Sequence, residues 1–177
     1  MEFKFLSEDE KEYYREQIIE LLLESDGDFL PPLSSRGSTR DNSFSSANLR
    51  SDGVVSYYNS MNSQQILVAM AGGAVVGFVS FYENYAGGEE PNIYVSTLVV
   101  AKSARGAGLT SKMYDYLFNE IYADRNIYTR TWSTNAAHTK ILSRFGFSES
   151  KRIKDDRGIG IDTVYYVRVA KEPCLQK

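Results

Sequence analysis

The stretch from Val95 to Leu117 decides the fold. It reads Val-Ser-Thr-Leu-Val-Val-Ala-Lys-Ser-Ala-Arg-Gly-Ala-Gly-Leu-Thr-Ser-Lys-Met-Tyr-Asp-Tyr-Leu. Its first part is an apolar, β-rich run, whereas the later apolar residues recur at helical spacing on the face formed by Leu109, Met113, Tyr116, Leu117 and Ile121. The stretch therefore predicts a strand, a glycine loop and a helix in direct succession.

The loop between this strand and this helix contains Arg105, Gly106, Ala107 and Gly108. Two glycines let the backbone turn tightly and expose its N–H groups, and the helix adds roughly half a positive charge at its N-terminus. This combination predicts a phosphate cradle. The spacing does not fit a P-loop, because Lys112 is misplaced, or a dinucleotide fingerprint, whose third glycine position is Ser111 here.

Length and charge limit the function classes. At 177 residues the chain suits a single domain over residues 1–177. With 20 basic and 23 acidic residues the net charge is −3, which disfavours nucleic acid as a partner. Cys174 is the only cysteine and His138 the only histidine, so we expect no metal centre and no disulfide. No stretch approaches about 18 apolar residues, and we expect a soluble, cytoplasmic protein without a membrane partner.

Periodicity and turn residues predict the other elements. Ser7 and Glu10 form a capping box for a helix that Asp26-Gly27 ends. Further segments follow: a short helix at Val54–Met61, strands at Gln65–Met70, Ala74–Tyr82, Ile127–Ser133 and Asp162–Val169, a helix after Asn135, a strand leaving from Phe147, and a solvated tail from Ala170. A strand at Glu2–Leu6 precedes them all.

The serine-rich segment Asp28–Gly53 has no clear periodicity. A loop this long inside a compact domain is usually functional or disordered. Its apolar residues, including Phe29 and Phe44, favour a functional lid, and a flexible connection is the alternative.

Two local patterns resemble the GNAT N-acetyltransferases. Arg105 and Gly108 match the acetyl-CoA motif Arg/Gln-x-x-Gly-x-Gly/Ala, although Thr110 departs from the small last position. Asn135, followed by Gly146-Phe147, resembles the family's later strand–helix signature. The predicted order, a strand, two helices, three strands, a helix, a strand, a helix and two strands, is also similar. The resemblance implies the GNAT fold, an α/β fold with a mixed, mostly antiparallel seven-stranded sheet flanked by about four helices.

The resemblance also implies where acetyl-CoA, the co-substrate, binds. Two central parallel strands would splay apart and leave the backbone of Leu98, Val99 and Val100 free to bond the pantetheine arm. The loop residues Arg105, Gly106, Ala107, Gly108, Leu109 and Thr110 would hold the pyrophosphate. Asn135 would lie beside the pantetheine, and local rules also make it a helix N-cap.

Amine acetylation needs a base for the ammonium proton and an acid for the leaving thiolate. The family's usual tyrosine acid falls on Leu142, and its carboxylate base is missing because Ser96 and Thr97 occupy the central strand. His138 lies one helical turn before Leu142 and is our catalytic candidate, with a solvent-facing or capping role as the alternative. Glu83 is a weaker base candidate and otherwise a solvated edge residue, and water could remove the proton instead.

The acceptor site is less specific in the sequence. Arg36, Arg40 and Arg157 could bind a carboxylate or phosphate on the substrate, or could cap loops and pair with nearby aspartates. Tyr57 and Tyr82 could line an aromatic pocket or simply pack.

Together these features predict an acetyl-CoA-dependent N-acetyltransferase that acts on a primary amine of a small molecule or a protein. The alternative is a catalytically silent acetyl-CoA-binding GNAT module that acts as a sensor or interaction protein. The chain could also form a homodimer.

Overall fold

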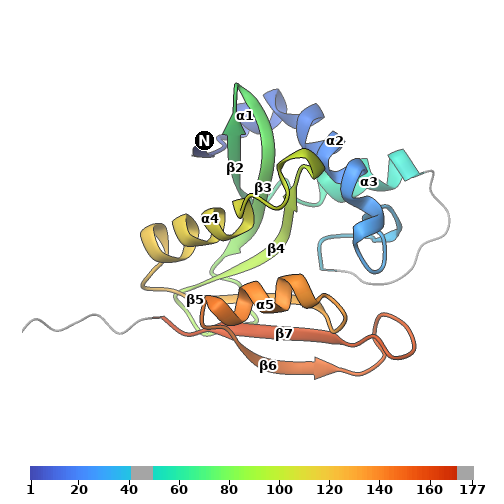
Figure 1. Cartoon of the computed structure of the whole chain (residues 1–177), viewed down its shortest axis with the longest axis vertical. Coiled ribbons are helices and arrows are strands. Elements are labelled where there is room, and N and C mark those ends of the chain that lie inside the picture. Colours follow the sequence, from blue (N-terminus) through green and yellow to red (C-terminus); the bar gives the residue numbers. More distant parts are fainter. Residues whose placement is uncertain (41–49, 171–177) are drawn as a thin grey trace, which may run out of the picture. The chain divides into compact units, whose positions relative to one another are not determined.

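The computed structural model describes residues 1–40 and 50–170. The predicted tail after Ala170, with Cys174, and part of the predicted lid, with Phe44, lie outside the described residues. Contacts divide the chain into two compact units: Met1–Phe81 with Ser96–Met113, and Tyr82–Val95 with Tyr114–Lys177. The elements, shown in Figure 1, are β1 (Glu2–Phe5), α1 (Glu8–Tyr13), α2 (Arg15–Ser25), η1 (Asp26–Asp28), η2 (Leu33–Ser35), α3 (Arg50–Asn59), β2 (Gln65–Ala71), β3 (Ala74–Glu83), β4 (Asn92–Val100), η3 (Lys102–Ala104), α4 (Leu109–Asp115), η4 (Tyr116–Ile121), β5 (Asn126–Trp132), α5 (Ala136–Arg144), β6 (Ser148–Ile153) and β7 (Thr163–Arg168).

The seven strands form one sheet in the order β1-β2-β3-β4-β5-β7-β6. β4 and β5 pair in parallel, while the pairs β1–β2, β2–β3, β5–β7 and β6–β7 are antiparallel. The predicted α/β fold with a mostly antiparallel seven-stranded sheet is therefore confirmed. The described residues contain five α-helices rather than about four, because Tyr14 divides the first predicted helix into α1 and α2.

The first unit owes its core to the alternation of β2. Ile66, Val68 and Met70 point to one face of the sheet and join a buried cluster with residues of α2 and α3. The other face approaches α4, since a Cβ built at Gly77 would lie 3.5 Å from side-chain atoms of both Leu109 and Met113. Val99, near the end of β4, belongs to the same buried cluster.

The predicted lid is shorter than expected. α3 begins at Arg50 instead of Val54, and short 3₁₀ turns, η1 and η2, occupy part of the segment. Asp26 organises this region because its carboxylate accepts hydrogen bonds from the Ser34 N–H (2.7 Å) and hydroxyl (3.0 Å) and from Arg50 Nε (3.0 Å). The buried carboxylate thus satisfies the Ser34 N–H, a backbone donor that a helix or strand would otherwise pair, and also binds two side chains.

The helix after the glycine loop changes its period. α4 continues into a π-helical turn, η4, in which the Tyr122 N–H donates to Leu117 O at 3.0 Å. The predicted face is therefore wrong at its end: Ile121 is 40% exposed, and Tyr114 and Phe118 are fully buried instead. Arg168 of β7 stabilises the turn by donating to Phe118 O (2.8 Å) and to Asn119 Oδ1 (2.6 Å).

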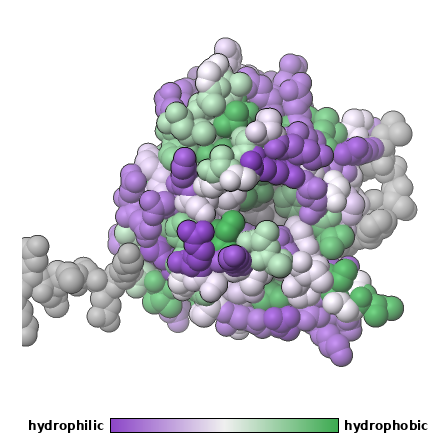
Figure 2. Space-filling view, in the orientation of Figure 1, coloured by the Kyte–Doolittle hydropathy of each residue, from purple (hydrophilic) through white to green (hydrophobic). Residues whose placement is uncertain are grey.

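On the face seen in Figure 2, small groups of hydrophobic residues stand among hydrophilic ones. Large apolar side chains that are strongly exposed, such as Ile159 and Tyr13, are far apart in the sequence. Exposed apolar residues of this kind are ordinary on a protein surface. In the part of the chain that the structure describes, every helix is too short or too polar to cross a membrane.

Candidate active site

The glycine loop has the backbone conformation that a phosphate cradle requires. Gly106 has φ +79° and Gly108 has φ +74°, in the left-handed region that other residues rarely adopt. A Cβ built at either glycine would have no heavy atom within 4 Å. The Lys112 N–H donates to Gly108 O at 3.1 Å, so the N–H groups of Leu109, Thr110 and Ser111 precede the helix's own hydrogen bonds. The loop thus presents exposed backbone next to donors without an intrahelical partner.

Arg105 braces this loop. Its Nε donates to Val100 O at 3.1 Å, one terminal nitrogen donates to Ser25 Oγ at 3.1 Å, and the same nitrogen lies 2.8 Å from a carboxylate oxygen of Asp28. The side chain therefore ties the loop to the end of α2. Its predicted contact with a pyrophosphate stays a prediction, since Asp28 already neutralises much of its charge.

β4 spans the two units, Asn92–Val95 in the second and Ser96–Val100 in the first. The parallel register runs from Asn92↔Asn126 to Val95↔Thr129. Leu98 is half-buried, while Val99 and Val100 are buried. The predicted splay of the two strands and the predicted pantetheine contact of Leu98–Val100 stay predictions.

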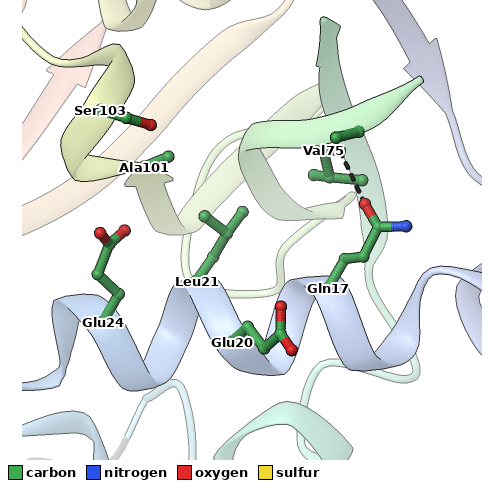
Figure 3. Close-up of a pocket in the computed structure, with 8 residues that line it drawn as sticks. Gln17, Glu20, Leu21, Glu24, Val75, Ala101 and Ser103 are labelled. Atoms are coloured by element: carbon green, nitrogen blue, oxygen red, sulfur yellow. Dashed lines mark hydrogen bonds between the residues drawn. The ribbon is translucent and has the colours of Figure 1, made fainter. Parts of the chain in front are cut away.

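A surface hollow lies beside the start of the glycine loop (Figure 3). Leu21 and Val75 give it an apolar side, and the carboxylates of Glu20 and Glu24 stand along α2. Glu24 also accepts a hydrogen bond from the Lys102 N–H at 3.0 Å. Carboxylates repel phosphate oxygens, so we do not assign the pyrophosphate to this hollow.

Asn135 is the N-cap of α5. Its Oδ1 accepts from the His138 N–H at 3.2 Å, and its Nδ2 donates to Thr131 Oγ1 at 3.2 Å. The capping role is confirmed, and the predicted pantetheine contact stays a prediction. The cap fixes the first turn of the helix that carries His138.

His138 does not face solvent freely. Its Nε2 lies 2.8 Å from the hydroxyl of Tyr114, whose ring stacks on Phe118 (centroids 4.5 Å apart) and meets the edge of Phe145. Burial lowers the pKa of His138 to about 4 and raises the pKa of Tyr114. The imidazole is therefore neutral at pH 7, and because the Tyr114 O–H is the stronger donor, it fits the tautomer in which Nε2 accepts.

Glu83 is held by a different set of neighbours. Its carboxylate accepts from the Tyr122 hydroxyl at 2.6 Å and pairs with Arg125 at 3.4 Å. Tyr122 and Arg125 follow η4, whereas His138 lies on α5. These contacts fit the alternative role of Glu83 as an edge residue of the sheet. Its role as a base stays a prediction.

The predicted acceptor residues of the first unit are mostly engaged. Arg36 is 7% exposed and donates to Pro31 O (3.0 Å) and Leu30 O (3.2 Å), which makes it a loop cap. Tyr57 is fully buried, so its ring packs, and its hydroxyl bonds Thr97 Oγ1 at 2.8 Å. Arg40 is exposed, and its role stays a prediction.

In the second unit, Arg157 lies 5.6 Å over the ring of Trp132 and donates to Thr163 Oγ1 at 2.9 Å. It therefore stands beside Trp132 at the end of β5, three residues before the Asn135 cap. Tyr82 is half-buried near the end of β3. Both residues belong to the second unit, whereas the acceptor residues of the preceding paragraph belong to the first. Their predicted contact with a substrate stays a prediction.

The hydrogen-bond partners of His138 and Ser96 were not predicted from the sequence. Tyr114 was overlooked because the predicted apolar face, which ran through Leu109, Met113 and Tyr116, did not include it. Gln64, which is 1% exposed and bonds Ser96, precedes β2 without any local signal. In residues 1–40 and 50–170 the structure has no group of three His, Cys, Asp or Glu side chains that could hold a metal ion.

Comparison with known proteins agrees with this geometry. The chain matches the acetyltransferase (GNAT) family over residues 35–147. It is therefore a member of the GNAT acetyltransferase family. A comparison with curated proteins found no match.

Solved structures show the same fold. The Salmonella typhimurium protein yncA, solved with its cofactor acetyl-CoA, is 16% identical with a TM-score of 0.65, and the match covers 100% of this chain and 98% of that one. A ribosomal-protein-alanine N-acetyltransferase from Brucella melitensis is 16% identical with a TM-score of 0.66, over 96% and 99% of the two chains. An aminoglycoside 6′-N-acetyltransferase complexed with coenzyme A is 14% identical with a TM-score of 0.65, over 98% and 99%.

Proposed function

We propose that the protein is an acetyl-CoA-dependent N-acetyltransferase whose acceptor is a primary amine of a small molecule or a protein. The observation that carries the proposal is the open glycine loop between β4 and α4, where Gly106 and Gly108 both have positive φ and free space at Cβ. Family membership supports acetyl transfer, and fold relatives solved with acetyl-CoA or coenzyme A support the co-substrate.

Bound acetyl-CoA would supply a thioester, whose carbonyl is already activated. The N–H groups of Gly106–Ser111 would bind the pyrophosphate, with the partial positive charge of the helix start behind them. The β4 backbone at Leu98–Val100 would hold the pantetheine arm. The chain's main contribution on this view is position, which can supply a large part of a rate enhancement.

The acid and base candidates considered in the sequence offer little proton transfer to or from the reacting amine and thiolate. Leu142 is fully buried and cannot donate, and the imidazole of His138 has its pKa lowered to about 4. These two observations favour a second function, a GNAT module that binds acetyl-CoA without turnover. Release of free thiol from acetyl-CoA in the presence of pooled amines separates the two functions, because only an acetyltransferase releases thiol in an amine-dependent way.

The cradle itself is tested by matched glycine variants. Gly108→Val should weaken acetyl-CoA binding by roughly 10- to 100-fold in calorimetry, the cost of one lost hydrogen bond to a charged group. Gly73→Val is the control, because Gly73 in the β2–β3 turn also has positive φ (+82°) and open space at Cβ. Both variants should lose about 1–2 kcal/mol of stability from left-handed strain.

Only Gly108→Val should lose affinity. Equal affinity of the two folded variants for acetyl-CoA would show that Gly108 is not part of a phosphate-binding loop.

A further inference from the structure

The strands β5, β7 and β6, all in the second unit, form a sheet with two unlike faces (Figure 1). Along β5, Ile127, Thr129 and Thr131 point to one face, and all three are at most 3% exposed. Arg168, which pairs with Ile127 across β5 and β7, donates to Phe118 O of η4 at 2.8 Å. This face is therefore the one that packs inside the unit.

The opposite face carries aromatic and cationic side chains. Directly opposite residues of antiparallel strands share a face, so the register defines its members. They are Tyr128, Arg130 and Trp132 on β5, Val167, Tyr165 and Thr163 on β7, and Ser148, Lys151 and Ile153 on β6. We call these nine residues the cationic face. All except the buried Thr163 are half-buried or exposed, and none of the nine is Asp or Glu.

The middle row of the cationic face places an aromatic ring between two cations. Arg130 Cζ lies 6.0 Å from the centroid of the Tyr165 ring, and Lys151 Nζ lies 5.8 Å from it. Arg130 Nη1 also donates to the Tyr165 hydroxyl at 3.4 Å. A cation within about 6 Å of a ring centroid is attracted to the ring. Tyr165 therefore holds together two positive charges that repel each other.

Arg157 adds a third cation at one end of this face. Its Cζ lies 5.6 Å from the centroid of the Trp132 ring, and its Nε donates to Thr163 Oγ1 at 2.9 Å. The Thr163 hydroxyl in turn donates to Asp156 Oδ2 at 2.6 Å. A carboxylate therefore balances part of the charge at this end, and the middle row carries most of the positive potential.

Two further carboxylates of this region pair with Arg152 instead of the cationic face. Glu149 Oε2 lies 2.6 Å and Asp162 Oδ2 lies 2.9 Å from terminal nitrogens of Arg152. Within residues 1–40 and 50–170, Lys151 forms no ion pair, although its side chain is exposed. The Lys151 charge thus meets an aromatic ring where a carboxylate could bind.

The arrangement favours a peptide over nucleic acid. Single strands of nucleic acid stack their bases on open aromatic rings, whereas Tyr165 and Trp132 already carry the protein's own cations. The net charge of −3 also disfavours a phosphate backbone. In an extended peptide, alternate side chains lie roughly 6.5–7 Å apart on one side, and cations on neighbouring or next-neighbouring strands are spread over roughly 5–10 Å. Successive acidic side chains therefore fit this spread.

We propose that the cationic face binds an acidic segment of another protein, whose carboxylates contact Lys151, Arg130 and Arg157. The rings of Tyr165 and Trp132 hold the cations in place before the partner arrives, which reduces the entropy lost on binding. The inference goes beyond acetyl transfer, because it concerns a face of the second unit and requires no acetyl-CoA.

A blocked acidic peptide tests the proposal. The probe is a short peptide of alternating Glu and Ser, acetylated and amidated so that it carries no acceptor amine, and the matched Gln–Ser peptide is the control. Trp132 is the only tryptophan, so its fluorescence reports on this face. The acidic peptide should change the fluorescence saturably at low salt and lose its effect at about 1 M salt, where charges are screened within about 3 Å. The Gln–Ser peptide should have no effect.

Charge variants locate the binding. Lys151→Gln should weaken it by about 2- to 5-fold, the worth of one exposed ion pair. Lys151→Glu adds a repulsion of similar size and should weaken it by about 4- to 25-fold. Lys140→Gln and Lys140→Glu, at an exposed lysine of α5, make the same changes in net charge and should keep the parent's affinity.

Ring variants test how the cations are held. Tyr165→Leu should weaken binding, because it releases Arg130 and Lys151, while Tyr165→Phe keeps the ring and should bind nearly as the parent does. If Tyr165→Leu does not fold, the substitutions at Lys151 and Lys140, both exposed, still decide.

Three results would overturn the proposal. The first is the absence of saturable binding of the acidic peptide, or equal affinities of Lys151→Glu and Lys140→Glu, which would show a response to net charge alone. The second is a single-stranded oligonucleotide that binds more tightly than the peptide and depends equally on Lys151, which would make this face a nucleic-acid site. The third is self-association in sedimentation that Lys151→Glu abolishes, which would assign the face to a second copy of the chain.

Discussion

The glycine loop of the first unit and the Tyr114–His138 pair of the second unit show two ways in which a chain prepares a site. The loop Arg105–Gly108 consists of backbone in an unusual conformation with space left open around it. The pair consists of a buried Tyr114 stacked on Phe118 and a half-buried His138 bonded to its hydroxyl, and desolvation favours the neutral form of both. The glycine loop depends on two residues without a side chain, whereas the Tyr114–His138 pair depends on the aromatic residues packed around it.

The largest expected effect is a loss of stability when the Tyr114–His138 pair is disrupted. Tyr114→Ala should destabilise the protein by about 3–5 kcal/mol, because it removes a fully buried aromatic ring that contacts Phe118 and Phe145. Tyr114→Phe keeps the ring and leaves His138 without its hydroxyl partner, which should cost about 1–3 kcal/mol. Urea denaturation measures both. Equal losses in the two variants would contradict the view that packing dominates this region.

A smaller effect should appear in the pH dependence of stability. The pKa of His138 is about 4 when folded and near 6.5 when exposed, so the unfolded chain binds more protons between these values. Stability should be fully present above about pH 6.5 and fall by up to about 3 kcal/mol as the pH drops through about 4. In His138→Gln this component should vanish in thermal melts across pH 4–7.

His138 also decides between catalysis and structure. With a neutral, hydrogen-bonded imidazole, His138→Gln should leave the limbs of the activity profile between pH 5 and 8 in place. The loss of such a limb in the variant would restore His138 as the acid–base residue of the sequence prediction.

The smallest expected change in stability concerns the ion pair that braces the glycine loop. Asp28 and Arg105 form an ion pair whose side chains are 47% and 40% exposed, and such pairs contribute about 0.2–1 kcal/mol. Asp28→Ala should change stability no more than this, yet it frees the guanidinium to meet a phosphate, so acetyl-CoA affinity should rise slightly at low salt. Calorimetry at two salt concentrations measures it. A fall in affinity would mean that Arg105 acts by bracing the loop.

Patterns that encode backbone conformation were predictable from the sequence. The two glycines, the Ser7 capping box, the Gly72-Gly73 turn and the Asn135 cap each follow from local rules and stand in the structure where those rules put them. The order of strands and helices along the chain followed from hydrophobic periodicity together with the family resemblance. These features depend on a few neighbouring residues, which a sequence displays directly.

Features that depend on distant partners were not predictable. Nothing near His138 in the sequence indicates that its partner is Tyr114, 24 residues earlier. Arg36 carried the same charge as Arg40 in the sequence, but Leu30 and Pro31 carbonyls take up its guanidinium. Hydrogen bonds through Gln64 link Thr39 to Ser96, 57 residues apart, which no window of periodicity spans.

The π-turn η4 has a consequence for comparing this chain with its relatives. A hydrogen-bonded loop from Tyr122 N–H to Leu117 O encloses one residue more than an α-helical loop does. A relative whose helix is regular throughout would need one residue fewer between the glycine loop and β5. An alignment that forbids gaps inside helices would then shift every position from Tyr122 onward by one, and Asn135 and His138 would be matched to the wrong residues.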